Sequence, residues 1–289
     1  MGMQQPREKH INNPLTTDEI LSLLKHAREL GAKVLAISGE GEPLLDVRFK
    51  KIVSTANDLG FIPFVASNGR LLSPDTISFL IENNASITIS LDTLDPKDYD
   101  EKCGVAGSLP NVLGNIETAR RLFAEKIRCE NGFRVMQCGI HTTLSVQDIG
   151  EIRKMQDFCG DSLYLSIGLL AEGVKNDLIL KRAAIESIDP ELLTPLLLTS
   201  AGNGRSVCGF FYYGLSIGFD GSILLDVHAL ETGGKLQNIR DIGMEGAVKL
   251  VRSAIEDFYS LPDADNDYCI VRSKRYQSFV QSIGRGEGK

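Results

Sequence analysis

The residues best suited to carry chemistry form the loop Ser38-Gly39-Glu40-Gly41-Glu42-Pro43, which begins at the last residue of the apolar run 34–38. Its two glycines allow a sharp turn and a close approach of the backbone to a ligand, and the proline fixes the exit of the loop. Such a backbone can offer carbonyl oxygens to a cation such as an ammonium group. Because ligands of parallel α/β folds bind at the carboxyl ends of strands, this position favours a ligand-binding loop. The alternative is a tight turn with two solvated glutamates.

Polar residues also end or follow the later apolar runs. They stand in pairs near the ends of three successive runs: Ser67 and Asn68, Ser90 and Asp92, and His141 and Thr143. His141, at the end of its run, is expected to face the ligand and to touch substrate or cofactor. Cys138, three residues earlier, falls on the opposite face of the same run and is expected in the core.

These apolar runs alternate with stretches of helical periodicity. The expected strands are 34–38, 61–67, 86–91, 133–143 and 163–170. The expected helices begin near Thr16, Leu45, Ser73, Asn111 and Val146. Continuous apolar strands between amphipathic helices indicate a parallel sheet with right-handed crossovers. The sequence therefore predicts an α/β domain over residues 1–172.

The pattern changes after residue 172. We predict a helical linker over 173–205 and a small β-hairpin-plus-helix module over 206–289. Phe219-Asp220-Gly221 lies between two short strand-like runs and is typical of a hairpin turn. A helix is expected at about 245–258, followed by an acidic turn and a final short helix.

The composition excludes several classes of protein. The chain has 289 residues, of which 43% are apolar and 24% charged, so it can bury a sizeable core and does not resemble a disordered chain. No apolar run reaches the roughly 18–20 residues of a membrane span, and the first residues lack the apolar segment of a secretory signal. A net charge of −7 argues against a sequence-independent nucleic-acid binder. We expect a cytoplasmic protein without nucleic-acid or membrane partners.

The order of the motifs resembles the radical S-adenosylmethionine superfamily from Leu15 to about Leu170. Glu40-Gly41-Glu42-Pro43 stands where the family has G-G-E-P, Ser67-Asn68-Gly69 stands where it usually has T-N-G, and Ser90-Leu91-Asp92 ends the next strand. The resemblance implies a partial βα barrel that binds S-adenosylmethionine. The contacts it implies are Glu40, Gly41, Glu42 and Pro43 at the methionyl group, Ser67 and Asn68 at the next strand end, Ser90 and Asp92 near the ribose, and Thr143, Leu169 and Leu170 near the ribose and adenine.

The chain departs from the family in its cysteines. The family holds a 4Fe–4S cluster with C-x-x-x-C-x-x-C on a loop before the Leu15 helix, but no cysteine precedes Cys103 here, and the first barrel strand is missing too. Two interpretations compete, a fragment that starts at an internal methionine and a natural cluster-free relative. We favour the fragment, because without the leading strand the run 34–38 is a bare apolar edge strand, which natural proteins usually cover.

The C-terminal module resembles the twitch or SPASM extension of the same superfamily, which often carries an auxiliary iron–sulfur cluster. Cys208, Asp226 and Cys269 stand at three of the four ligand positions that the resemblance implies, and Arg272 stands at the fourth. Arginine cannot ligate iron, because its guanidinium stays protonated. We expect a degenerate metal site, or two buried cysteines in a module that shapes a substrate pocket. His228, two residues after Asp226, is a further candidate for contact with substrate.

Three functions follow from these residues. The first is a radical S-adenosylmethionine enzyme that acts on a small molecule or a peptide, with its 4Fe–4S segment absent from the sequence given. The second is a cluster-free relative that acts as a binding or partner protein. The third is a non-radical βα-barrel hydrolase or lyase that uses Glu40, Glu42, Asp92 and His141 as acid–base groups. The substrate and the oligomeric state stay open.

Overall fold

A computed structural model describes most of the chain. The described residues are 13–38, 41–131, 133–144, 151–169, 214–225, 235–262 and 274–284. The chain divides into two compact units, and each unit consists of two separate segments of the chain. The barrel unit comprises Met1–Pro6 and Thr17–Ala171, and the C-terminal unit comprises Arg7–Thr16 and Glu172–Lys289.

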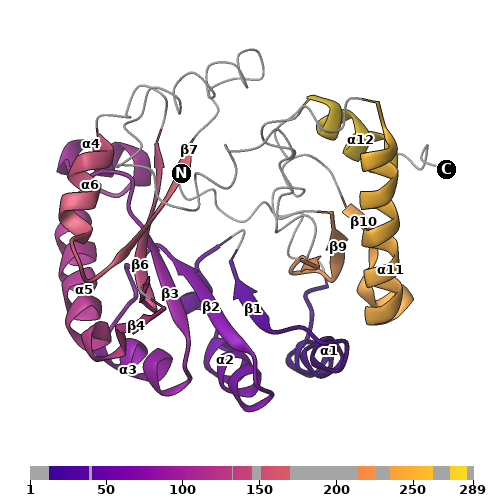
Figure 1. Cartoon of the computed structure of the whole chain (residues 1–289), viewed down its shortest axis with the longest axis horizontal. Coiled ribbons are helices and arrows are strands. Elements are labelled where there is room, and N and C mark those ends of the chain that lie inside the picture. The colour runs from indigo at the N-terminus through magenta and orange to yellow at the C-terminus, as the bar shows by residue number, and fades with distance from the viewer. Residues whose placement is uncertain are drawn as a thin grey trace. The chain divides into compact units, whose positions relative to one another are not determined.

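The barrel unit is built on a five-stranded parallel sheet (Figure 1). Its spatial order is β1-β2-β3-β6-β7, and all four strand pairs are parallel. The strands are β1 Val34–Ile37, β2 Ile62–Ser67, β3 Ser86–Ser90, β6 Cys138–Leu144 and β7 Tyr164–Leu169. The predicted α/β fold with a partial parallel barrel is therefore confirmed.

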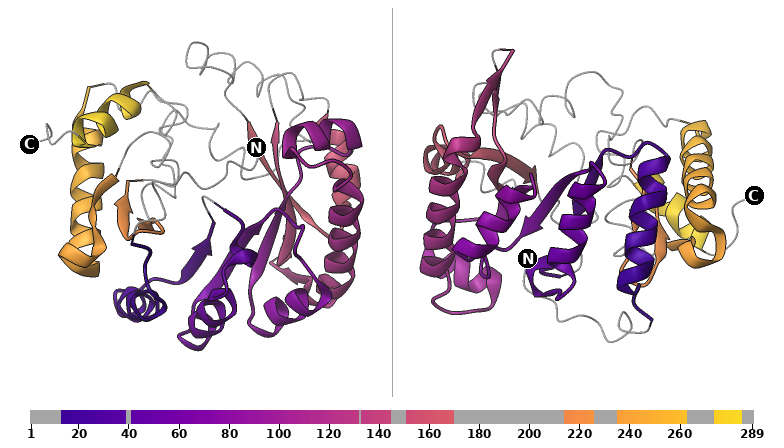
Figure 2. Two further views of the ribbon diagram at one scale, coloured as in Figure 1. Left: turned by 180° about the vertical axis from the view of Figure 1, so that it is seen from behind. Right: turned by 90° about the horizontal axis from the view of Figure 1, so that it is seen from below.

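Helices cover the outer face of this sheet, as the views from behind and from below show (Figure 2). They are α1 Thr17–Glu29, α2 Phe49–Asp58, α3 Pro74–Glu82, α4 Pro96–Cys103, α5 Leu109–Phe123 and α6 Glu151–Cys159, with short 3-10 turns at Pro43–Leu45 and Ala124–Lys126. The core lies between the helices and the sheet. Val53, Val65, Ile87, Ile116 and Ile140 are fully buried in it. Cys138 belongs to this core, as predicted.

Three local details differ from the sequence prediction. The helix expected from Leu45 begins at Phe49, because Asp46 accepts the Arg48 amide in a turn that precedes it. The run 133–143 is divided into β5 Phe133–Val135, which forms a hairpin with β4 Arg128–Glu130, and β6. Residues 96–103, for which the sequence predicts no helix, form α4, and its last residue Cys103 is half-buried.

Strand β1 is an edge of the sheet formed by the described residues, with β2 as its neighbour. Val34 at its start is 55% exposed, and Ile62, its register partner on β2, is 49% exposed. Exposed apolar side chains on an edge strand are unusual in a folded protein.

The C-terminal unit contains a three-stranded antiparallel sheet in the order β10-β9-β8. Its elements are β8 Ser216–Ile217, β9 Ser222–Leu224, β10 Lys235–Asn238, α11 Ile239–Ser260 and α12 Lys274–Gly284. The turn between β8 and β9 lies at Phe219-Asp220-Gly221, as the sequence predicts. Phe258 on α11 and Tyr276 on α12 are fully buried and meet edge to face, with ring centroids 5.4 Å apart.

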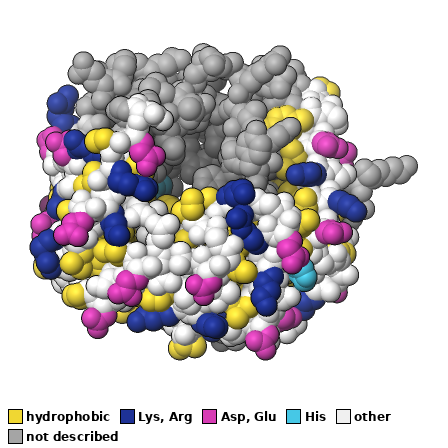
Figure 3. All heavy atoms as spheres, turned by 60° about the horizontal axis from the view of Figure 1, so that its bottom comes forward, with side chains coloured by type: hydrophobic (Ala, Val, Ile, Leu, Met, Phe, Trp, Pro, Cys, Tyr) yellow, Lys and Arg dark blue, Asp and Glu magenta, His cyan; other side chains and the backbone are white. Residues whose placement is uncertain are grey.

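Basic and acidic side chains are interspersed over the described part of the face seen in Figure 3. Mixed charge of this kind keeps a surface solvated without forming a field of one sign. No helix in the described part of the chain combines the length and the apolar character that a bilayer span requires.

Candidate functional site

The loop after β1 is fixed by the carboxylate of Glu42. Its Oε1 accepts hydrogen bonds from the Leu44 amide at 3.1 Å and the Ser67 hydroxyl at 2.9 Å, and its Oε2 accepts from the Asn68 amide at 2.7 Å. Ser67 is 3% exposed, and its hydroxyl also accepts the Gly69 amide at 3.0 Å. The Glu42 side chain therefore ties its own part of the chain after β1 to the end of β2.

The Ser67-Asn68-Gly69 turn is held from its other side as well. Gly69 has a φ of +75°, and a Cβ there would lie 2.7 Å from the Cγ2 of Ile89, so only glycine fits. Asn115 on α5 donates from Nδ2 to the Gly69 carbonyl at 2.9 Å, and Asn68 Oδ1 accepts the Arg70 amide at 3.0 Å. The turn is thus a rigid neighbour of the Glu42 loop.

The register of the strands sets two layers of side chains on the concave face of the sheet. Residues that pair across parallel strands point to the same face. The deeper layer contains Thr88, Gly139 and Tyr164, and the layer nearer the carboxyl ends contains Ser90, His141 and Ser166. The residues that alternate with them along the strands point to the other face, and Ile89 and Ile140 are fully buried there in the core under the helices.

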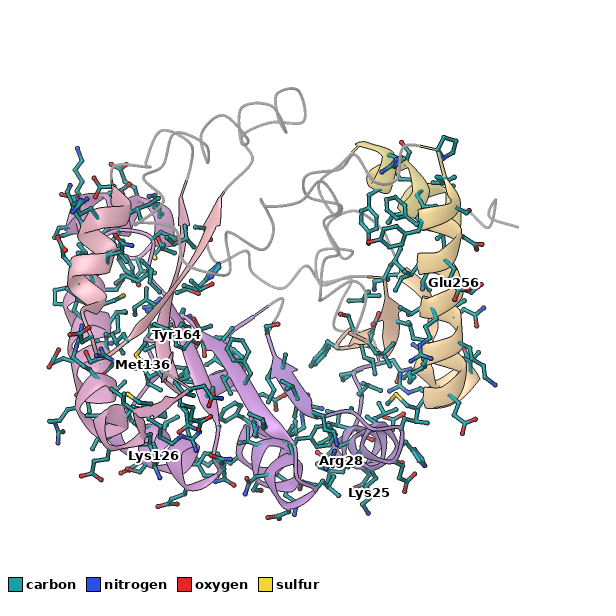
Figure 4. All side chains as sticks on the ribbon, viewed as in Figure 1. Lys25, Arg28, Lys126, Met136, Tyr164 and Glu256 are labelled. Carbon is teal, nitrogen blue, oxygen red and sulfur yellow. The ribbon has the colours of Figure 1, made fainter. Side chains whose placement is uncertain are left out.

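Tyr164 fills the deeper layer (Figure 4). Its ring lies against Gly139, where any side chain would collide with it, and its hydroxyl donates to the Ile87 carbonyl at 3.1 Å. Burial raises the pKa of the Tyr164 hydroxyl to about 12, so the ring stays neutral. The tyrosine therefore spans from β7 across β6 to β3 and supports the layer above it.

His141 lies in the layer nearer the carboxyl ends. Its Nδ1 is 3.2 Å from the Ser166 hydroxyl, and its Nε2 is 3.4 Å from the Thr143 hydroxyl. Burial lowers the pKa of the imidazole, and the nearby Asp92 carboxylate opposes this effect in part. The ring is therefore neutral at neutral pH and can both donate and accept a hydrogen bond.

Asp92 joins the end of β3 to the end of β6. Its Oδ1 accepts the Thr143 amide at 2.7 Å, and the amide of the preceding Leu91 donates to the His141 carbonyl at 2.9 Å. The structure thus brings the predicted residues Asp92, His141 and Thr143 together at one place.

The other predicted residues have the following positions. Glu42, Ser67 and Asn68 form one hydrogen-bonded cluster, and Ser90 is exposed at the end of β3. Gly41 and Pro43 flank Glu42 in the loop, and Leu169 is the last residue of β7. The candidates that lie outside the described residues are Glu40, Leu170, Cys208, Asp226, His228 and Cys269.

Sequence reasoning missed Ser166 and Asn115. Ser166 lies 25 residues after His141 and meets it because β6 and β7 pair in this register. Asn115 lies four residues after Asn111 on α5, and both donate to the Arg70 carbonyl, at 3.4 Å and 3.2 Å. Two asparagines at this helical spacing were a usable signal, because neighbours four apart share one helix face.

The charged groups at this edge come from the segments that follow the strands. The inward positions of the five strands hold no Lys, Arg, Asp or Glu, and the carboxylates of Glu42 and Asp92 border them. Among the described residues, no three His, Cys, Asp or Glu side chains group as a metal site. The four described cysteines, Cys103, Cys129, Cys138 and Cys159, are free thiols. Within the described part of the chain no thiolates therefore gather as a 4Fe–4S cluster requires.

Comparison with known proteins gives a family match. A sequence model of the Radical SAM superfamily matches residues 4–155, just over half of the chain. A protein named Probable GTP 3′,8-cyclase from Methanococcus maripaludis is 28% identical over 160 residues, which are 54% of this chain and 52% of the relative. The AdoMet-dependent heme synthase of Methanosarcina barkeri is 28% identical over 141 residues, 48% of this chain and 37% of the relative. The matched region thus spans about half the length, or less, of these curated relatives.

Solved structures resemble the whole chain. Streptococcus suis SuiB bound to S-adenosylmethionine has a TM-score of 0.67 and 18% identity, covering 94% of this chain and 70% of that chain. Native anSMEcpe with bound AdoMet has a TM-score of 0.58 and 14% identity, covering 100% of this chain and 93% of that chain. At such identities the likeness concerns the fold.

Proposed function

The chain belongs to the radical S-adenosylmethionine superfamily, and on that premise we propose that it binds S-adenosylmethionine at the carboxyl ends of its parallel strands. The observation that carries the proposal is the pair of polar clusters at this edge, one around Glu42 and one around Asp92. The superfamily resemblance assigns residues of these clusters to the methionyl group and the ribose. The loop Glu40–Pro43 would meet the methionyl group.

The chemistry of the edge supports a cationic ligand. S-adenosylmethionine carries an ammonium and a sulfonium group, and the two carboxylates at this edge attract positive charge. A ribose offers hydroxyls that Asp92, Ser90 and Thr143 can bind, and Leu169 and Leu170 would lie near the adenine. The neutral imidazole of His141, held by Ser166, can bind either cofactor or substrate.

We propose that the bound cofactor serves radical chemistry on a small molecule or a peptide. A 4Fe–4S cluster would supply the electron for such chemistry, and the described residues offer no set of thiolates to hold one. This chain's own residues would bind the cofactor, orient its ribose and exclude water. A peptide substrate finds support in SuiB, whose fold is similar and which is known bound to the precursor peptide SuiA.

Calorimetry on metal-free protein tests the cofactor site. We expect S-adenosylmethionine to bind and GTP to bind far more weakly, because a triphosphate requires cations that the inward strand positions lack. Asp92→Asn should lower the affinity for S-adenosylmethionine about tenfold, which is about 1.4 kcal/mol. Asp58→Asn, at the exposed end of α2, is the matched control and should bind as the wild type does. Heat from GTP but none from S-adenosylmethionine would refute the proposal.

A second candidate is a cluster-free relative that binds S-adenosylmethionine as a partner protein. In the sequence given no cysteine precedes Cys103, as this candidate requires. Anaerobic reconstitution with iron and sulfide tests whether this chain holds a cluster of its own. A charge-transfer absorption band lost in Cys208→Ser and Cys269→Ser would assign a cluster to the C-terminal cysteines. Cofactor binding without any such band would support the cluster-free candidate.

A further inference from the structure

The segment Asn13–Leu15, which lies shortly before α1, is held by hydrogen bonds and packing within the C-terminal unit. The Leu15 amide donates to the Phe219 carbonyl in the hairpin turn at 2.9 Å. The Leu15 side chain is 6% exposed, and a Cβ at Gly221 would lie 3.2 Å from its Cδ2. Leu15 therefore packs directly on the backbone of the β8–β9 turn.

The side chain of Arg240, in the first turn of α11, binds main-chain carbonyls of the same segment. Its Nη2 donates to the Pro14 carbonyl at 3.0 Å, and its Nη1 donates to the Asn13 carbonyl at 3.3 Å and the Asp220 carbonyl at 3.1 Å. One planar guanidinium thus joins two segments more than 200 residues apart in the sequence. A planar fork of donors suits such converging carbonyls better than an ammonium does.

The surface that receives the segment is itself rigid. Asn238 donates to the Asp220 carbonyl at 2.9 Å and accepts the Arg240 amide at 3.0 Å. Asp220 accepts from the Ser222 amide at 2.9 Å and from Lys235 Nζ at 2.8 Å. Burial raises the pKa of Asp220, but the hydrogen bonds from Lys235 and Ser222 outweigh this effect and bring it to about 2. The turn therefore keeps its charge and its shape across the physiological pH range.

We propose that the hairpin turn 218–221 and Arg240 form a binding site for an extended peptide segment, and that its occupant is Asn13–Leu15 of the same chain. The site binds two carbonyls, one amide and one apolar side chain of the segment. Proteins that bind extended peptides likewise use main-chain hydrogen bonds together with contacts to side chains. Arg240 is the positioning residue, since it binds the carbonyls three and four residues before α1 begins at Thr17. The C-terminal module is thus completed by N-terminal residues. This inference does not depend on binding of S-adenosylmethionine.

Hydrogen exchange on the full chain tests the proposal through the Leu15 amide. In the wild type this amide should exchange far more slowly than in an unstructured peptide, because it is buried and bonded. Arg240→Ala should accelerate exchange over residues 13–16 at least tenfold, and Arg240→Lys should have an intermediate effect. Arg252→Ala, which removes an exposed arginine from the same helix, is the matched control and should leave exchange of this segment unchanged.

The exchange of β9, β10 and α11 in the same experiment separates positioning from unfolding. The proposal requires these elements to stay protected in Arg240→Ala while the segment 13–16 opens. If Arg240→Ala opens the whole unit, Leu15→Ala tests the site from the side of the segment and should open residues 13–16 alone. An unprotected Leu15 amide in the wild type, or unchanged exchange in both variants, would overturn the proposal.

Discussion

The carboxylate of Glu42 gives the sharpest prediction, because its three hydrogen bonds can be changed by replacing one oxygen. In Glu42→Gln the side chain keeps one acceptor oxygen and gains an NH2 group. If the oxygen faces Asn68, the Leu44 amide meets the NH2; if it faces Leu44 and Ser67, the Asn68 amide meets the NH2. One backbone donor therefore loses its acceptor in either orientation.

The expected magnitude follows from the charge of the acceptor. A hydrogen bond to a charged group contributes about 1.5–3 kcal/mol, and the remaining bonds become neutral and weaker. We expect Glu42→Gln to lower the free energy of unfolding by about 2–4 kcal/mol. For a unit of this size that corresponds to a fall in the melting temperature of roughly 4–16 °C.

Calorimetric and urea unfolding of the ligand-free protein are the assays. Glu101→Gln removes an exposed carboxylate on α4 and serves as the control; its stability should stay within about 0.5 kcal/mol of the wild type. If Glu42→Gln is equally mild, the carboxylate does not tie the β1 loop to β2. The proposed shape of the cofactor loop would then lose its physical basis.

Further predictions concern the strand interior and the thiols. Gly139→Ala should lower the free energy of unfolding by about 1–3 kcal/mol, because its methyl group would displace the Tyr164 ring; urea unfolding measures this. Because the pKa of His141 is lower in the folded protein than its unfolded value of 6.5, the unfolded chain binds the proton first. Wild-type stability should therefore fall as the pH drops below about 6.5 and level off below the folded pKa, and the pH profile of His141→Asn should be flatter. Iodoacetamide should label the exposed Cys129 well before Cys138, whose pKa burial raises to about 12; peptide mass mapping against time checks the order.

The sequence alone determined the order of the elements of the barrel unit. Apolar runs and helical stripes predict strands and helices because burial of apolar groups is the dominant local signal. The same signal failed for α4, which buries only Tyr99 and is otherwise polar. Its start was still marked, since Asp95 accepts the Asp98 amide and Pro96 follows as the first helical residue. A cap can thus identify a helix that periodicity cannot.

The sequence also determined that the candidate site residues lie at one edge of the sheet. Glu42, Ser67, Asp92 and Thr143 all stand at strand ends, and parallel strands place their carboxyl ends at one edge. It did not determine what each side chain does there. The Glu42 carboxylate bonds to Ser67 and Asn68, an arrangement that depends on the close approach of two loops.

Only the tertiary structure decided the contacts between distant segments. His141 meets Ser166 through the register of two strands, and Leu15 meets Phe219 across 204 positions of the chain. Local sequence signals report burial and backbone preference within a few residues, whereas a contact across such distances depends on how the whole chain folds. For that reason Leu15 reads in the sequence as the start of a helix, although the structure makes it part of the C-terminal unit.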